Sequence, residues 1–166
     1  MPSKIPSITL GAAVYTVAAL FTGFVTIQGG TSAQYVTTLL CCVSALLGPA
    51  VAVWHYTTTH KLTLAAGPGA GLGAAAVVAG GLISYVITLG LQALGFYPSN
   101  AEMIDRQRDQ LLAQGLEPDQ VEGALQMAEM FSGPLGVVVN VIVAAVIGAI
   151  GGAIAAAIFK RGPVDG

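Results

Sequence analysis

Charged side chains are scarce in this chain. Only 8% of its 166 residues are Asp, Glu, Lys or Arg, whereas a soluble domain carries roughly 25%. Between positions 5 and 96 the only such residue is Lys61, and nine charges then fall between positions 102 and 129. Because 55% of the residues are hydrophobic, this distribution excludes a single water-soluble globule. It predicts a multi-pass membrane protein with one polar insert.

Cysteine is almost absent as well. Cys41 and Cys42 are adjacent in an apolar run, and a disulfide between neighbours would need strained geometry. No disulfide framework and no zinc-ligand spacing can be built from them, so we expect both to pack as small hydrophobic residues. The net charge of −2 and the lack of a basic stripe give no reason to expect a nucleic-acid partner.

Four apolar runs are long enough to cross a bilayer, which requires roughly 20 residues in a helix. They predict an all-α fold, an integral membrane four-helix bundle in a single membrane domain of residues 1–166. A turn is expected at 28–32, and an irregular start is expected for the third span at Gly67-Pro68-Gly69, with the helix proper near 71–94. The first run is too long for a signal-peptide core. The predicted spans cover about residues 5–27, 36–56, 65–94 and 134–159.

The polar segment 98–133 is predicted to be an extracytoplasmic insert of two short helices. Ser99-Asn100-Ala101-Glu102 has the pattern of a capping box, Gly115 suits a helix end, and Pro118 suits the first position of the next helix. The apolar face of the second helix has two interpretations: a lid or docking surface, or a connector that packs on the bundle. The residues of this amphipathic face are Val121, Ala124, Leu125, Ala128 and Phe131.

Candidate chemistry inside the spans is sparse. No Asp or Glu lies in a predicted span, which argues against a carboxylate-coupled carrier. His55 is expected at the end of the second span and His60 in the following loop, where an aromatic belt is the alternative to a metal or proton-relay role. Gln92 and Asn140 must find hydrogen bonds, either between helices or in a substrate cavity near Pro49.

Small residues four apart predict close helix packing in the third and fourth spans. Whether these faces meet inside one chain or contact another chain is left open by the sequence. The candidate helix-packing residues are Gly69, Gly73, Ala76, Gly80, Gly148 and Gly152.

Catalytic motifs are lacking: the chain has no G-x-S-x-G, H-E-x-x-H or phosphate-binding loop, and no paired carboxylates in its spans. We therefore expect a protein that is not an enzyme and that requires no cofactor and no metal.

The layout resembles domain of unknown function 4199, a family of small four-helix bacterial membrane proteins. The resemblance rests on a span that ends in His55-Tyr56, a polar loop with Lys61, a glycine-rich third span, an acidic helical insert and a final span. It implies a location in the inner membrane of a Gram-negative bacterium. It implies no catalytic residue.

Basic residues near the span ends predict the orientation. Lys4, Lys61, Lys160 and Arg161 share one side, against Arg106 and Arg108 on the other, so both termini are expected in the cytoplasm. The expected function is a non-enzymatic subunit or accessory protein of a membrane complex, for example a respiratory one. Its partners would be the lipid bilayer and other membrane subunits or itself. The alternative is a small transporter or channel that acts as a homo-oligomer.

Overall fold

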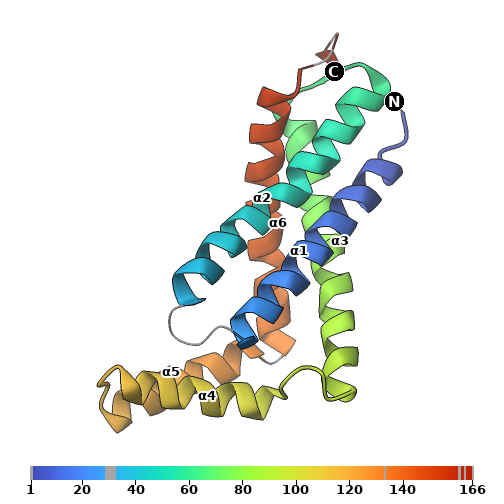
Figure 1. Cartoon of the computed structure of the whole chain (residues 1–166). Helices are drawn as coiled ribbons and strands as arrows, with labels where there is room; N and C mark the ends of the chain where they lie inside the picture. Colours follow the sequence, from blue (N-terminus) through green and yellow to red (C-terminus); the bar gives the residue numbers. More distant parts are fainter. Residues whose placement is uncertain (1, 29–32, 133, 161, 163, 166) are drawn as a thin grey trace. The chain divides into compact units, whose positions relative to one another are not determined.

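The computed structural model describes residues 2–28, 33–132, 134–160, 162, 164 and 165. Within these residues the chain forms six helices and two very short strands (Figure 1). The expected turn at 28–32 lies largely outside the described residues. The elements are α1 (Ile5–Gln28), α2 (Ala33–His60), β1 (Thr63–Leu64), α3 (Ala66–Ala93), α4 (Asn100–Ala113), α5 (Pro118–Ser132), α6 (Pro134–Ile158) and β2 (Val164–Asp165).

Four of the helices, α1, α2, α3 and α6, are long and apolar enough to cross a membrane. The sequence-based prediction of an all-helical chain with four such helices is confirmed. Hydroxyl side chains on these helices bond to their own backbone one turn earlier: Thr22 Oγ1 donates to Ala18 O at 2.8 Å, and Ser44 Oγ donates to Leu40 O at 2.7 Å. Such bonds satisfy polar groups without help from water.

Two expected boundaries are wrong. His60 is the last residue of α2 and not part of a loop. The segment Gly67-Pro68-Gly69 is not an irregular start, because α3 is already helical from Ala66. A proline in the first turn is compatible with a helix, since the backbone N–H that it lacks would have no helical partner there.

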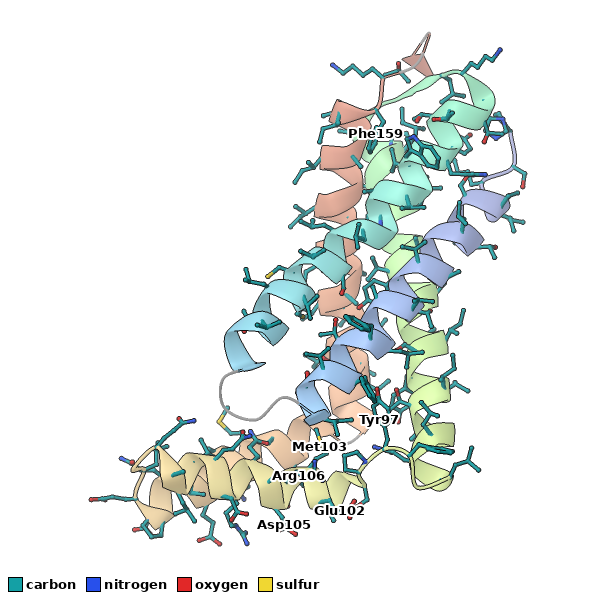
Figure 2. The ribbon with its side chains drawn as sticks, in the orientation of Figure 1. Tyr97, Glu102, Met103, Asp105, Arg106 and Phe159 are labelled. Carbon is teal, nitrogen blue, oxygen red and sulfur yellow. The ribbon has the colours of Figure 1, made fainter. Side chains whose placement is uncertain are left out.

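The chain divides into two compact units. Unit 1 consists of residues 1–86 and 142–166, and unit 2 consists of residues 87–141. Ala52, Val53, Tyr56 and Leu72 are among the residues that form the buried core of unit 1, and Phe159, which follows α6, packs against this core (Figure 2).

At one end of unit 1, polar contacts join segments that are far apart in the sequence. The hydroxyl of Tyr56 donates to the backbone oxygen of Pro2 at 3.4 Å. β1 and β2 pair in parallel, and Thr63 Oγ1 both donates to Gly162 O at 2.8 Å and accepts from Gly162 N at 3.3 Å. The N-terminal segment, the α2–α3 connection and the C-terminal segment therefore lie at the same end of unit 1 (Figure 1).

In unit 2, α4 and α5 form a helical hairpin. The sequence predicted where its helices begin and where α4 ends. Ser99 and Glu102 make both bonds of a capping box. Gly115 has φ +83° directly after α4, and the Leu116 N–H bonds to Leu111 O at 3.3 Å, as in a Schellman helix end. α5 begins at Pro118. The capping box, the glycine helix end and the proline helix start are confirmed.

Candidate functional site

Small residues bring α3 and α6 into backbone contact within unit 1. A Cβ added to Gly69 would lie 2.9 Å from Gly152 O, and one added to Gly148 would lie 2.8 Å from Gly73 O. A Cβ on Gly152 would lie 2.9 Å from the Gly73 Cα. Real Cβ atoms do not approach so closely, so only glycine fits at these four positions. The structure thus places these residues against one another in the same chain.

The other two candidate packing residues of α3, Ala76 and Gly80, contact α1. A Cβ on Gly80 would lie 2.7 Å from Ala12 O of α1, and Ala76 Cβ would lie 3.1 Å from a Cβ added to Gly11. α3 therefore uses one glycine-rich surface for two neighbours, α6 near its start and α1 further along.

The contact between α1 and α2 also depends on glycine, and sequence analysis missed it. A Cβ on Gly11 would lie 2.7 Å from both Gly48 O and Ala52 Cβ, and one on Gly48 would lie 2.8 Å from Tyr15 Cβ. Neither glycine belongs to a small-x-x-x-small pair as prominent as those of α3. The local signals that could have revealed it are small residues four positions away: Ser7 for Gly11, and Ser44 and Ala52 for Gly48.

Hydrogen bonds between side chains join α1 to α2 on both sides of this contact. The Ser7 hydroxyl and His55 Nδ1 are 2.9 Å apart, and Ser7 is only 1% exposed. Further along, the Thr22 and Ser44 hydroxyls are 3.2 Å apart. The order of these pairs shows that the two helices run antiparallel, with glycines at the point of closest approach.

The two histidines have separate environments. His55 contacts Ser7, whereas the His60 ring packs edge-on against Tyr56, with 4.8 Å between ring centroids. Among the described residues, no group of three or more His, Cys, Asp or Glu is arranged to hold a metal ion. The histidine contacts are those of helix packing.

The residues expected near a cavity have different surroundings. Gln92 Nε2 donates to Pro98 O at 3.2 Å and so bridges the turn after α3. Pro49 is buried, 3.3 Å from a Cβ added to Gly151 of α6. Asn140 is exposed on α6. Two hollows in the described part of the chain are lined by other residues.

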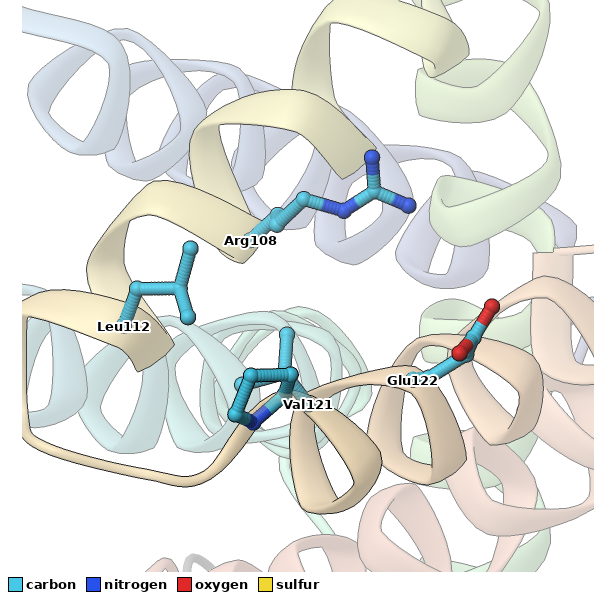
Figure 3. Close-up of a pocket in the computed structure, with 5 residues that line it drawn as sticks. Arg108, Leu112, Val121 and Glu122 are labelled. Atoms are coloured by element: carbon cyan, nitrogen blue, oxygen red, sulfur yellow. The ribbon is translucent and has the colours of Figure 1, made fainter.

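One of these hollows lies between α4 and α5, with a volume of about 300 Å³ (Figure 3). It is lined by the apolar side chains of Leu112, Pro118 and Val121 and by the charged side chains of Arg108 and Glu122. An apolar lining with one charge of each sign is suited to weak contact with an amphipathic segment.

The amphipathic face of α5 is largely shielded from solvent where the structure describes it. Val121 and Leu125 are 3% and 4% exposed, and Ala124 and Ala128 are half-buried. The side chain of Phe131 lies outside the described residues. Other apolar side chains of unit 2 are exposed, among them Met103, Leu112 and Met127.

The surface of α4 and α5 is acidic, and one carboxylate has a defined role (Figure 2). Glu102 Oε2 accepts hydrogen bonds from Ser99 N at 2.7 Å and from Ser99 Oγ at 3.1 Å. These bonds, first the backbone one and then the hydroxyl one, lower the pKa of the Glu102 carboxyl below its ordinary value of 4.5, with a smaller contribution from Arg106. The carboxylate therefore stabilises the start of α4.

Comparison of the chain with protein families, with curated proteins and with solved structures finds no match. Function must therefore be inferred from the arrangement of the described residues.

Proposed function

We propose that this chain is an integral membrane protein without enzymatic activity of its own that serves as a subunit or accessory protein of a membrane complex, for example a respiratory one. The observation that supports this role most directly is that polar side chains of the long apolar helices form hydrogen bonds to other helices of the same chain. Ser7 contacts His55, Thr16 donates to Gly80 O at 3.0 Å, and Thr22 contacts Ser44. These bonds join helices to one another and do not gather around a cavity.

The hairpin of α4 and α5 is the surface that we propose for partner subunits. It presents exposed apolar side chains, including Met103 and Met127, on an acidic background. Interfaces between subunits commonly combine an apolar centre with a polar rim, and methionine adapts readily to different contact surfaces.

The proposed location is the inner membrane of a bacterium, with both termini in the cytoplasm. Lys4, Lys61 and Lys160 belong to the end of unit 1 where the N-terminal and C-terminal segments meet, and basic residues favour the cytoplasmic side. The orientation can be tested with single cysteines in a Cys41→Ala/Cys42→Ala background. A membrane-impermeant maleimide should label Glu117→Cys in intact cells and Lys160→Cys only after permeabilisation.

The accessory role is tested by mild detergent extraction from native membranes, followed by a native gel and mass spectrometry of the band. Co-migration with larger subunits in a fixed stoichiometry is the expected result. Migration as the chain alone would overturn the proposal and favour the alternative, a small transporter or channel, which a liposome flux assay would then test.

A pair of exposed positions on α5 can map the contact. Met127→Lys should release the larger subunits, because it places a charge in the proposed apolar contact. Gln126→Lys introduces the same charge at a neighbouring exposed polar position and should leave the complex intact.

A further inference from the structure

Unit 1 and unit 2 carry net charges of opposite sign. Unit 1 contains four basic residues and one acidic residue, whereas unit 2 contains two arginines and seven acidic residues. Three of the basic residues of unit 1, Lys4, Lys61 and Lys160, are among the residues that the structure describes. Positive charge is therefore concentrated in unit 1.

Backbone contacts bring these three lysines to one end of unit 1. Lys61 directly follows α2, and a Cβ added to Gly162, two residues after Lys160, would meet the backbone oxygen of Lys61. The hydroxyl of Tyr56, five residues before Lys61, donates to the backbone oxygen of Pro2, in the segment that carries the first lysine. The three lysines thus come from separate segments and together define the basic end of unit 1.

The positions of these lysines relative to the long apolar helices correspond to the depth of lipid headgroups. Lys4 precedes the candidate span of α1 by one residue, Lys61 follows that of α2 by one residue, and Lys160 follows that of α6 by two residues. Lys61 and Lys160 are exposed, and Lys4 is half-buried. When these helices cross a membrane, the ammonium groups lie at the surface of the hydrocarbon core, next to the phosphate groups of the lipids.

We propose that the basic end binds the headgroup of an anionic phospholipid. A lysine ammonium group offers three hydrogen-bond donors and no acceptor, and an ionised phosphodiester carries negative charge and only accepts hydrogen bonds. Basic residues next to membrane spans attract anionic lipids for this reason. With both termini in the cytoplasm, the bound lipid belongs to the cytoplasmic leaflet.

The acidic residues of unit 2 do not compete for these lysines in a membrane. α3 and α6 both connect the basic end to the hairpin of α4 and α5, so the crossing of a membrane by these two helices puts the hairpin on the opposite side. The inference therefore rests on the proposed membrane insertion, and it is independent of the accessory role.

The single tryptophan of the chain provides the probe for a test. Trp54 is 43% exposed and lies seven residues before Lys61, about 10 Å away at the helical rise per residue, within reach of the acyl chains of a lipid bound there. Bromine atoms on acyl chains quench tryptophan fluorescence on contact. The purified chain is reconstituted in phosphatidylcholine vesicles that contain the same fraction of either dibrominated phosphatidylglycerol or dibrominated phosphatidylcholine. Stronger quenching by the brominated phosphatidylglycerol is the expected result.

Lysine substitutions test whether the basic end provides this selectivity. Lys4→Gln, Lys61→Gln and Lys160→Gln should each lower the preference for phosphatidylglycerol roughly two- to fivefold, because each basic residue near an anionic surface contributes a similar amount. Arg106→Gln/Arg108→Gln removes two positive charges from unit 2 and should leave the preference unchanged. An equal loss in the arginine variant would show that the preference reflects net charge alone and would overturn the proposal.

Failure of this proposal and failure of membrane insertion give different results. Equal quenching by both brominated lipids would overturn the lipid selectivity and leave membrane insertion intact. No quenching by either lipid would show that Trp54 does not contact acyl chains and would overturn both. Unchanged quenching of each lysine variant by brominated phosphatidylcholine checks that the variant is folded and inserted. Because no other subunit is present, none of these results depends on the accessory role.

Discussion

Gly73 of α3 and Gly152 of α6 touch through their backbones: a Cβ on Gly152 would lie 2.9 Å from the Gly73 Cα. Without a hydrophobic driving force between helices in lipid, close packing of this kind supplies much of the attraction. The two glycines thus hold together helices that lie more than 70 residues apart in the sequence.

Gly152→Ala is predicted to destabilise unit 1 by about 1–3 kcal/mol, because the added methyl group overfills the contact. Gly71→Ala is the matched control, since nothing lies within 4 Å of its added Cβ. The control should be neutral or stabilising by up to about 1 kcal/mol, as alanine favours a helix. Unfolding in detergent measures both values. Equal stability of the two variants would show that α3 and α6 are not in close contact.

The parts of the fold that local residues determine could be predicted from the sequence. The four apolar helices follow from long runs without charge, and the limits of the α4–α5 hairpin follow from Ser99, Glu102, Gly115 and Pro118. Each of these residues acts on backbone groups within four positions of itself, so its effect can be deduced without knowing the rest of the fold.

Contacts between distant segments could not be predicted in the same way. The close approach of Gly11 to Gly48 depends on which helix lies next to α1, and the sequence pattern does not specify neighbours. The pairing of β1 with β2 joins segments about 100 residues apart. α2 continues to His60, beyond the expected end, and the His60 ring packs on Tyr56, one turn earlier.

Ser7→Ala is predicted to destabilise the contact between α1 and α2 by about 0.5–1.5 kcal/mol, the usual net value of one hydrogen bond. Ser7 is buried and bonded to His55 across the helix pair. Thr9→Ala is the control, because Thr9 Oγ1 is exposed and bonds only within α1, to Ile5 O. Unfolding of the purified protein should show a clear loss for Ser7→Ala alone. A loss of the same size for Thr9→Ala would mean that the bond between the helices adds nothing.

The start of α4 is predicted to weaken in acid. The folded-state pKa of Glu102 lies below its ordinary value of 4.5, so the stabilisation by its carboxylate is complete above about pH 4.5 and disappears as the pH falls through the lower folded-state pKa. Amide hydrogen exchange at Glu102 and Met103 measures the effect. Glu102→Gln keeps a side chain that can close the capping box but cannot titrate, so its profile should be flatter over this range. Identical profiles for the two proteins would refute the prediction.

Lys61→Gly is predicted to stabilise the end of α2. Lys61 has φ +52°, and the Leu62 N–H bonds to Thr57 O at 3.2 Å, which is the helix end where glycine is most often found. A left-handed conformation costs a residue with a Cβ roughly 1–2 kcal/mol, so removal of the side chain should recover about 1 kcal/mol of the free energy of unfolding. Lys61→Ala removes the same charge and keeps the Cβ. The difference between the two variants therefore isolates the backbone contribution, and a Lys61→Ala variant as stable as Lys61→Gly would show that no strain is stored at this position.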